Sequence, residues 1–216
     1  MKPNTIQAVF FDFDGVVMNT EPQYTSFWQE VGRDYFPDSP NWAVEIKGQT
    51  LVQIFDLYFK DQTEVQQSIV EKLKSFELQM TFDYVPGFLS FIVDLHKYHI
   101  KTAVVTSSND AKMAHVYRMH PQFKSMFDVI VTADQIEQSK PDPACYLSAA
   151  DKVHVSPENS VVFEDSHHGI TAGKAAGAQV IGLATTHPAS DLEKFVNPII
   201  RDFVAFSYPK MIELLG

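Results

Sequence analysis

The sequence predicts an α/β fold in which a doubly wound, mostly parallel sheet forms the core and a helical cap domain is inserted into it. Two observations support this prediction. Short apolar segments rich in β-branched and aromatic residues alternate with segments whose apolar residues recur at helical spacing. The alternation is broken once, where about 85 residues separate the first two predicted strands, far more than a single crossover connection needs.

Five apolar segments have the length and composition of buried strands, and a sixth is weaker. In chain order, the predicted strands cover residues 6–13, 100–106, 127–132, 160–163, 179–183 and, as the weaker sixth, 199–206. Helical patterns lie between them, at residues 87–98, 109–119, 141–152 and 169–176. Strands that alternate with helices in this way favour parallel pairing, with helices on both faces of the sheet.

The long interval after the first strand is predicted to be the cap. Its helical candidates are residues 22–32, 49–60 and 63–80, and Pro86-Gly87 indicates the return to the sheet. The predicted organisation is a core of residues 1–17 and 86–216 and a cap of residues 18–85. The aromatic residues of the cap most simply form its own hydrophobic core, because a small helical domain needs large side chains to bury enough surface.

The composition is that of a globular protein with an acidic surface. Among 216 residues, 45% are hydrophobic, and 27 acidic against 17 basic side chains leave a formal net charge of −10. A chain this negative repels a phosphate backbone, so nucleic acid is not an expected partner. Its apolar runs are too short for a membrane span, and the first residues lack the features of a signal peptide. Cys145 stands alone and excludes an intramolecular disulfide, which fits the cytoplasm, where we expect a monomer.

Four polar clusters stand at or just after the ends of predicted strands. They are Asp12-Phe13-Asp14-Gly15, Thr106-Ser107-Ser108-Asn109, Lys140-Pro141 and Glu164-Asp165-Ser166. In a doubly wound sheet the carboxyl ends of the strands meet at one edge, where ligands bind, so the clusters are expected to converge on one crevice. Taken alone, the first cluster could be an ordinary acidic turn. It is the coincidence of all four that favours an active site.

The residue types in these clusters suit the transfer of a phosphoryl group. Asp12, Asp14 and Asp165 would bring carboxylates so close together that a cation must lie among them, and Mg²⁺, a hard ion that prefers oxygen ligands, is the natural partner. Thr106 offers a hydroxyl to an anion, and Lys140 offers a compact positive charge. A carboxylate nucleophile, a metal, a hydroxyl and a lysine are the groups that phosphoryl transfer requires.

These motifs, in this order, resemble those of the haloacid dehalogenase superfamily. The four motifs of that family are matched by Asp12, Asp14 and Gly15 with Thr20; by Val104-Val105-Thr106; by Lys140; and by Glu164-Asp165. The resemblance covers essentially the whole chain and is closest to the branch that holds β-phosphoglucomutase and the small sugar-phosphate phosphatases. It implies a Rossmann-like core with a helical cap.

The resemblance also implies catalytic roles. Asp12 would attack phosphorus and form an aspartyl phosphate, while Asp14 would protonate the leaving oxygen and then activate water. Thr106 and Lys140 would hold the phosphate of a small phosphorylated substrate. The polar residues after Thr106 are expected to bind substrate beside them: Ser107, Ser108 and Asn109.

A metal site is implied at the same edge of the sheet. Mg²⁺ would be bound by the Asp12 carboxylate, the Asp14 backbone carbonyl and Asp165, with Glu164 near it. Dehalogenases lack a carboxylate at the position of Asp14, so the resemblance favours phosphoryl transfer over dehalogenation.

Cap residues bear on the choice between hydrolysis and isomerisation. β-Phosphoglucomutases carry a histidine where Tyr24 aligns and an arginine where Leu51 aligns. Lys47-Gly48 matches the family's cap loop, and Trp28 matches an aromatic residue beside the substrate. Without the histidine and the arginine, the expected activity is hydrolysis, and a phosphosugar mutase is the alternative. The intact motifs argue against a catalytically silent binding protein, and the sequence does not choose among sugar phosphates, other monoesters and pyrophosphate.

Overall fold

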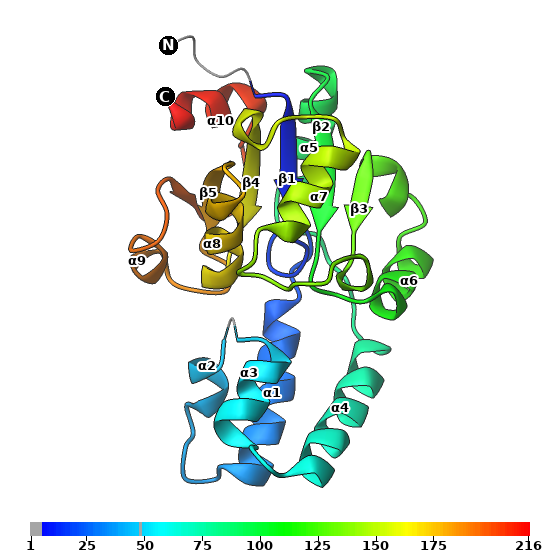
Figure 1. Ribbon diagram of the computed structural model, residues 1–216, viewed down its shortest axis with the longest axis vertical. Coiled ribbons are helices and arrows are strands. Elements are labelled where there is room, and N and C mark those ends of the chain that lie inside the picture. The colour runs from blue at the N-terminus through cyan, green and yellow to red at the C-terminus, as the bar shows by residue number, and fades with distance from the viewer. Residues whose placement is uncertain (1–5, 48) are drawn as a thin grey trace. The chain divides into compact units, whose positions relative to one another are not determined.

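The computed structural model of the protein describes residues 6–47 and 49–216 (Figure 1). The chain divides into two compact units. The core unit contains the described residues up to Asn19 together with Phe82–Gly216, and the cap unit is Thr20–Thr81. The chain therefore leaves the core unit after its first strand and returns to it before the second.

The core unit is built on a parallel sheet of six strands. The strands are β1 (Ala8–Phe11), β2 (Lys101–Val105), β3 (Val129–Val131), β4 (Ser160–Glu164), β5 (Gln179–Leu183) and β6 (Ile199–Ile200), in the order β3-β2-β1-β4-β5-β6. The chain extends the sheet on one side of β1 and then crosses to extend it on the other. The predicted α/β fold class is confirmed, and β1, paired with both β2 and β4, lies at the reversal where such folds bind ligands.

Each predicted strand is present, and the differences lie at the strand ends. β1 ends at Phe11, because the chain then turns back and the amides of Val17 and Met18 both donate to the carbonyl of Phe13. The length predicted for the sixth strand, 199–206, is wrong, since only Ile199–Ile200 pairs. Phe203 is buried but sits in a turn, so an apolar run there fills the core without forming a strand.

Helices cover both faces of the sheet (Figure 1). The helices of the core unit are α5 (Phe88–Lys97), α6 (Asp110–Met119), α7 (Ala144–Lys152), α8 (His167–Ala175), α9 (Ala189–Leu192) and α10 (Tyr208–Leu215), with 3₁₀ turns η1 (Phe123–Met126), η2 (Ala133–Gln135) and η3 (Pro157–Asn159). Successive residues of β1 point to opposite faces. Phe10 joins the apolar cluster formed with α7 and α8, whereas the ring of Phe11 stacks on Phe163 at 5.4 Å and meets Phe88 of α5 edge-on.

The cap unit is helical and has an aromatic core. Its helices are α1 (Glu21–Tyr35), α2 (Trp42–Glu45), α3 (Leu51–Tyr58) and α4 (Thr63–Glu77). Trp42 is 2% exposed and its ring stacks on Phe36 at 4.8 Å, so the cap aromatics form the cap's own core as predicted. A capping box starts α3, with Thr50 and Gln53 each accepting a hydrogen bond from the other's backbone amide. The sequence did not predict α2, because four residues are too few to show a helical period.

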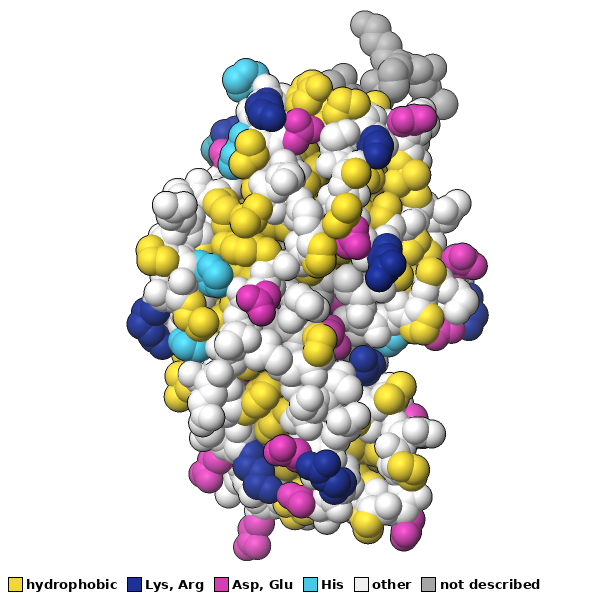
Figure 2. All heavy atoms as spheres, turned by 180° about the vertical axis from the view of Figure 1, so that it is seen from behind, with side chains coloured by type: hydrophobic (Ala, Val, Ile, Leu, Met, Phe, Trp, Pro, Cys, Tyr) yellow, Lys and Arg dark blue, Asp and Glu magenta, His cyan; other side chains and the backbone are white. Residues whose placement is uncertain are grey.

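The surface agrees with the acidic composition. On the face shown in Figure 2, lysine and arginine side chains are scattered among aspartate and glutamate rather than gathered in one stripe. Among the residues that the structure describes, the helices lack the combination of length and apolar character that crossing a bilayer requires.

Candidate active site

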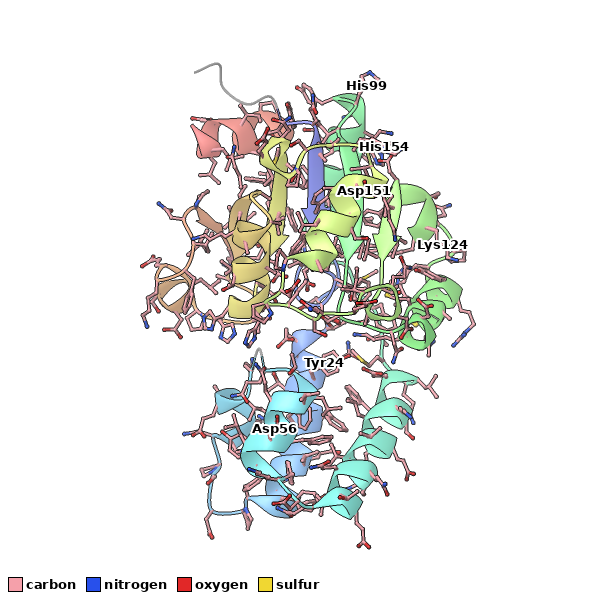
Figure 3. All side chains as sticks on the ribbon, in the orientation of Figure 1. Tyr24, Asp56, His99, Lys124, Asp151 and His154 are labelled. Carbon is pink, nitrogen blue, oxygen red and sulfur yellow. The ribbon has the colours of Figure 1, made fainter. Side chains whose placement is uncertain are left out.

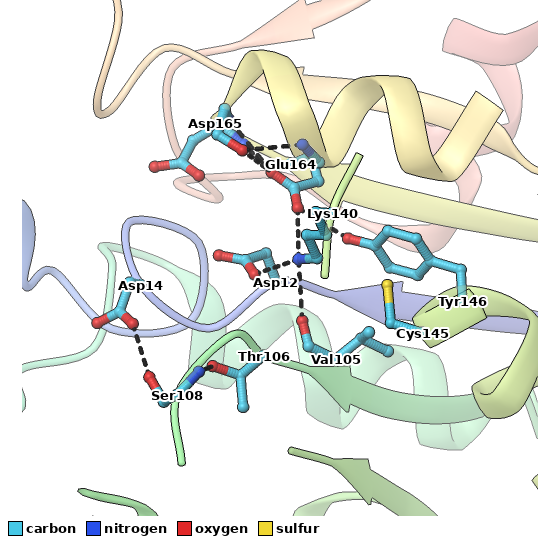
Figure 4. Close-up of polar contacts among 12 residues, drawn as sticks. Asp12, Asp14, Val105, Thr106, Ser108, Lys140, Cys145, Tyr146, Glu164 and Asp165 are labelled. Atoms are coloured by element: carbon cyan, nitrogen blue, oxygen red, sulfur yellow. Dashed lines mark hydrogen bonds and ion pairs between the residues drawn. The ribbon is translucent and has the colours of Figure 1, made fainter. Parts of the chain in front are cut away.

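Three of the four polar clusters follow neighbouring strands of the core unit. The register pairs Phe11 of β1 with Val104 of β2 and with Phe163 of β4, so the residues that follow these strands meet at one edge of the sheet. The amide of Asp12 donates to the carbonyl of Phe163 at 3.0 Å, which holds Asp12 beside the end of β4. The fourth cluster reaches the same point through Lys140, whose Nζ contacts Asp12 and the backbone carbonyl of Val105 (Figure 4).

Lys140 is the centre of a buried charge network. Its Nζ donates to Asp12 Oδ1 at 2.5 Å, to Glu164 Oε1 at 2.7 Å and to the carbonyl of Val105 at 3.1 Å. Burial alone would lower the pKa of the Lys140 ammonium, but the Asp12 and Glu164 carboxylates outweigh burial and raise that pKa well above its ordinary value. Lys140 is therefore a permanent cation in contact with Asp12, the carboxylate expected to be the nucleophile.

Asp12 is strongly perturbed by its surroundings. Burial raises the pKa of its carboxyl from 3.8 to about 7, the Lys140 ammonium opposes that rise, and the Glu164 carboxylate adds to it. Without a further cation, Asp12 thus holds a proton for part of the time at neutral pH. A divalent ion nearby would favour the anion, which is the form that can attack phosphorus.

The Glu164 carboxylate is fully buried and fully hydrogen-bonded. Oε1 accepts from Lys140 and from the Tyr146 hydroxyl at 2.8 Å, and Oε2 accepts from the amides of Asp165 and Ser166 and from the Ser166 hydroxyl. Gly169, in the first turn of α8, leaves room for this carboxylate, since a Cβ built there would stand 1.7 Å from Oε1. Both oxygens of Glu164 are therefore already engaged by the protein. Its main contact with the site is the one that orients Lys140.

Asp165 completes a group of carboxylates that could hold a metal. Ligand oxygens of Asp12, Glu164 and Asp165 all lie within 4.8 Å of one another. Asp165 is 3% exposed, and its Oδ2 accepts hydrogen bonds from the hydroxyls of Thr185, at 3.4 Å, and Thr186. Carboxylates are hard oxygen donors, so Asp12 and Asp165, with Glu164 next to them, fit Mg²⁺.

The loop after β1 brings Asp14 to the side of the site that is next to β2. Gly15 has a φ of +76°, and a Cβ there would collide with the Asp165 carboxylate, so only glycine makes this turn. The Asp14 carboxylate accepts from Ser108 Oγ at 3.0 Å and from Lys112 Nζ at 2.7 Å to each oxygen. Asp14 thus faces the β2 side of the site, and its side chain is not one of the three grouped carboxylates.

The segment after β2 forms a polar rim. Thr106 is 5% exposed and its hydroxyl accepts from the amide of Ser108 at 2.9 Å. Asn109 accepts from the amide of Lys112 and so caps α6, while Ser107 is exposed. The start of α6 therefore lies next to Asp14, on the β2 side of the site.

The cap residues expected to touch substrate are placed only within the cap unit. The Tyr24 hydroxyl, on α1, donates to Glu77 Oε1 at 2.9 Å (Figure 3). The ring of Trp28 meets Phe27 at 5.0 Å and Trp42 at 6.0 Å, so it packs in the cap's core. Lys47 is half-buried, and Gly48 lies outside the described residues. Their roles toward a substrate stay predictions.

Sequence reasoning missed four residues at the site: Lys112, Tyr146, Thr185 and Thr186. Thr185 and Thr186 follow β5. Because ligands bind at the carboxyl ends of the strands in such a sheet, the polar residues after this strand could have been predicted as well. Lys112 and Tyr146 lie within helices, and their neighbours in the chain do not reveal where they point.

Comparison with known proteins places this arrangement in a family. Residues 9–183 match the family model described as haloacid dehalogenase-like hydrolase. Over 192 residues the chain is 32% identical to the phosphorylated carbohydrates phosphatase of Thermotoga maritima, and the match covers 86% of this chain and 88% of that protein.

Two solved structures share the fold along nearly the whole chain. The HAD hydrolase of family IA, variant 3, from Entamoeba histolytica superposes with a TM-score of 0.81 at 23% identity and covers 97% of this chain and 99% of its own. The β-phosphoglucomutase of Clostridium difficile superposes with a TM-score of 0.76 at 21% identity, over 97% of this chain and 96% of its own. At these sequence identities the two structures are evidence for the fold alone.

Proposed function

The chain belongs to the family of haloacid dehalogenase-like hydrolases, and on that premise we propose a Mg²⁺-dependent phosphatase that hydrolyses a small phosphorylated metabolite through an aspartyl phosphate. The enzyme class is that of the relatives, phosphatases of the same family. The observation that carries the proposal is the contact of Lys140 Nζ with Asp12 Oδ1 at 2.5 Å, next to the buried carboxylates of Glu164 and Asp165. This combination supports the proposal, because phosphoryl transfer needs a nucleophile, a fixed cation and a metal-binding group close together.

In the proposed first step, Asp12 acts as the nucleophile. One of its carboxylate oxygens forms a bond to phosphorus as the bond from phosphorus to the ester oxygen breaks. Asp14 gives its proton to that leaving oxygen, and the product is an alcohol. In the second step, Asp14 takes a proton from water as the water oxygen attacks phosphorus. Inorganic phosphate leaves, and the Asp12 carboxylate is restored.

The metal fits the residues present. Asp12, Asp165 and the backbone carbonyl of Asp14 would hold Mg²⁺, with Glu164 behind them, since its oxygens already accept hydrogen bonds from five donors. When bound, the ion would reduce the repulsion between the carboxylates and the phosphate and polarise the phosphoryl oxygens. Lys140 and the Thr106 hydroxyl would bind those oxygens from the protein side, with Ser107, Ser108 and Asn109 along the rim.

The substrate is proposed to be a sugar phosphate. The Thermotoga maritima relative is named for phosphorylated carbohydrates, and the relation covers most of both chains. Lys47, Gly48, Tyr24 and Trp28 of the cap are proposed to select the organic part of the substrate. Hydrolysis is preferred to a mutase reaction because Tyr24 stands where the resemblance expects the mutase histidine, and its hydroxyl is engaged with Glu77. A single cysteine suits a reducing cytoplasm, where we propose that the enzyme acts as a monomer.

The test is release of inorganic phosphate from a panel of sugar phosphates, glycerol phosphate and pyrophosphate. We expect Mg²⁺-dependent release from at least one sugar phosphate, loss of that activity in EDTA and recovery with excess Mg²⁺. Asp12→Asn is the matched control and should release none, because an amide does not attack phosphorus. Interconversion of glucose 1-phosphate and glucose 6-phosphate that needs a bisphosphate primer, with little free phosphate, would identify a mutase instead. If the enzyme released phosphate from none of these substrates, the proposal would be overturned.

A further inference from the structure

Lys112 is a buried cation in an unexpected place. It is 4% exposed and lies in the first turn of α6, where the helix dipole disfavours a positive charge. Its Nζ stands 2.7 Å from both Asp14 oxygens and 5.4 Å from the centre of the Phe13 ring. A lysine is rarely buried without a partner, so this pairing with Asp14 accounts for its position.

Lys112 and Ser108 hold the Asp14 carboxylate from the same side. Both come from the segment that follows β2, and Ser108 is itself fixed by the bond from its amide to the Thr106 hydroxyl. In the sheet, β2 and β4 flank β1 on opposite sides. The carboxylates of Glu164 and Asp165 therefore lie on the β4 side, and Asp14 is turned toward the β2 side (Figure 4).

From this geometry we propose that Lys112 is the positioning residue for acid/base catalysis by Asp14, a role that rests on the proposed phosphatase function. Asp14 is 25% exposed in its side chain, so without donors it would have freedom to rotate. The ammonium lies against both oxygens and so restricts rotation of the group, both when the Asp14 carboxyl carries the proton for the leaving oxygen and when it is ionised and takes a proton from water. The Asp14 carboxylate is thereby kept on the β2 side, from which it would reach the leaving oxygen of a phosphate ester attacked by Asp12.

This role predicts a dependence on the leaving group. An alkoxide needs a proton as it departs, whereas 4-nitrophenolate departs readily without one. The measurement is kcat/KM for glycerol phosphate and for 4-nitrophenyl phosphate, because this quantity covers the steps up to departure of the leaving group. Lys112→Met is expected to lower kcat/KM for glycerol phosphate about 10- to 100-fold, a part of the roughly 100- to 10,000-fold that general acid catalysis contributes. It is expected to lower kcat/KM for 4-nitrophenyl phosphate by less than about threefold.

The controls separate positioning from binding and from folding. Lys124→Met removes an exposed lysine of η1, away from the site, and should change neither rate (Figure 3). Lys112→Arg keeps the charge with a different shape and should show the same dependence on leaving group, more weakly. In an Asp14→Asn background, Lys112→Met should have no further effect on the residual activity toward 4-nitrophenyl phosphate.

The outcomes that would overturn the proposal are specific. Equal loss for both esters would mean that Lys112 binds phosphate or only supports the fold, and unchanged rates would mean that it does not act on Asp14. If Lys112→Met does not fold, Lys112→Arg carries the test, since it changes the contact with Asp14 and keeps the charge. Absence of phosphate release by the unaltered enzyme would refute the proposed function itself, a result distinct from any of these.

Discussion

At the scale of single residues, the charged side chains of the site are buried and depend on partners of opposite charge. The side chains of Lys140, Asp12 and Glu164 are 7%, 13% and 0% exposed. An ion is tolerated in such a place only with a partner of opposite sign, and removal of one partner leaves the other uncompensated. Lys140 pairs with Asp12 and Glu164, and the Asp165 carboxylate lies beside these two, so this metal-free group carries an excess of negative charge.

The first prediction concerns that excess. In the metal-free protein, Asp12→Asn should raise the free energy of unfolding at pH 8 and have a smaller effect at pH 5. Burial raises the pKa of Asp12 from 3.8 to about 7 in the folded state, so the unfolded chain releases this proton first and stability falls as the pH rises between those values. At 1.36 kcal/mol per pKa unit the full penalty, reached above pH 7, is about 4 kcal/mol.

Urea denaturation in EDTA at the two pH values measures this effect. Asp151→Asn, at an exposed position in α7, is the control and should show no difference between pH 5 and pH 8 (Figure 3). An equal gain for Asp12→Asn at both pH values would show that Asp12 ionises as it does in the unfolded chain.

The second prediction separates the role of Glu164, the last residue of β4, from that of Asp165, which follows the strand. Asp165→Asn should weaken Mg²⁺ binding about tenfold more than Glu164→Gln, because Glu164 already accepts hydrogen bonds from five protein donors. Glu164→Gln should instead lower turnover at saturating Mg²⁺ by loosening Lys140. Calorimetric titration with Mg²⁺ compares the dissociation constants. Similar losses of affinity in the two variants would make Glu164 a direct ligand.

At the scale of elements, the helices that begin at the active edge are held by their first turns. Asn109 caps α6, and the Ser166 hydroxyl caps α8 by accepting from the amide of Gly169 at 3.0 Å. These caps stabilise each helix start by about 1 kcal/mol and set its distance from the strand before it. The residues that act in the site are thus positioned by helix termini as well as by strands.

The third prediction tests how closely α8 approaches Glu164. Gly169→Ala should lower the free energy of unfolding by about 2–3 kcal/mol and reduce turnover, since its Cβ would fall 1.7 Å from the Glu164 carboxylate. Gly173→Ala is the matched control in the same helix, where the nearest atom to a Cβ is a Val180 methyl at 3.0 Å. The gain in helix propensity, about 1 kcal/mol, is common to both variants. If both behave alike in chemical denaturation, the packing at Gly169 is not critical.

At the scale of the whole molecule, the chain leaves and re-enters the core unit through paired segments. Met18 bridges to Tyr84, the amide of Asn19 donates to the carbonyl of Asp83, and the amide of Val85 donates to the carbonyl of Val17. The two connections to the cap unit are therefore tied side by side within the core unit. Such a double connection suits rigid-body motion of an inserted unit, and we propose that the cap acts as a lid that keeps water from the aspartyl phosphate until it is needed.

The fourth prediction addresses this lid. Lys47→Ala should lower kcat/KM for the best substrate about tenfold, the effect of one lost charge-assisted hydrogen bond, while the melting temperature and the Mg²⁺ dissociation constant stay unchanged. The control is Lys60→Ala, an exposed lysine elsewhere in the cap unit. Steady-state kinetics on both variants decides the matter, and unchanged kcat and KM for Lys47→Ala would mean that this loop does not touch the substrate.

The sequence by itself determined the fold class, the strands and the residues that gather at the active edge. Periodicity and turn residues are local properties, and in a parallel sheet they suffice to predict which polar residues follow the strands and meet at one edge, even where the exact strand end differs. This is why Asp12, Lys140 and Asp165 could be named in advance and are found together at that edge.

Only the tertiary structure decided which side chains meet one another. Lys112 is 98 residues from Asp14, and Tyr146 is 18 residues from Glu164, and neither distance follows a spacing rule. Their pairing depends on the order of the strands and on the face of each helix that turns to the sheet. The same holds for the sixth strand, which is only Ile199–Ile200, while Phe203 beyond it is buried without belonging to a strand. Contacts of this kind are set by packing over the whole domain, which a local pattern does not contain.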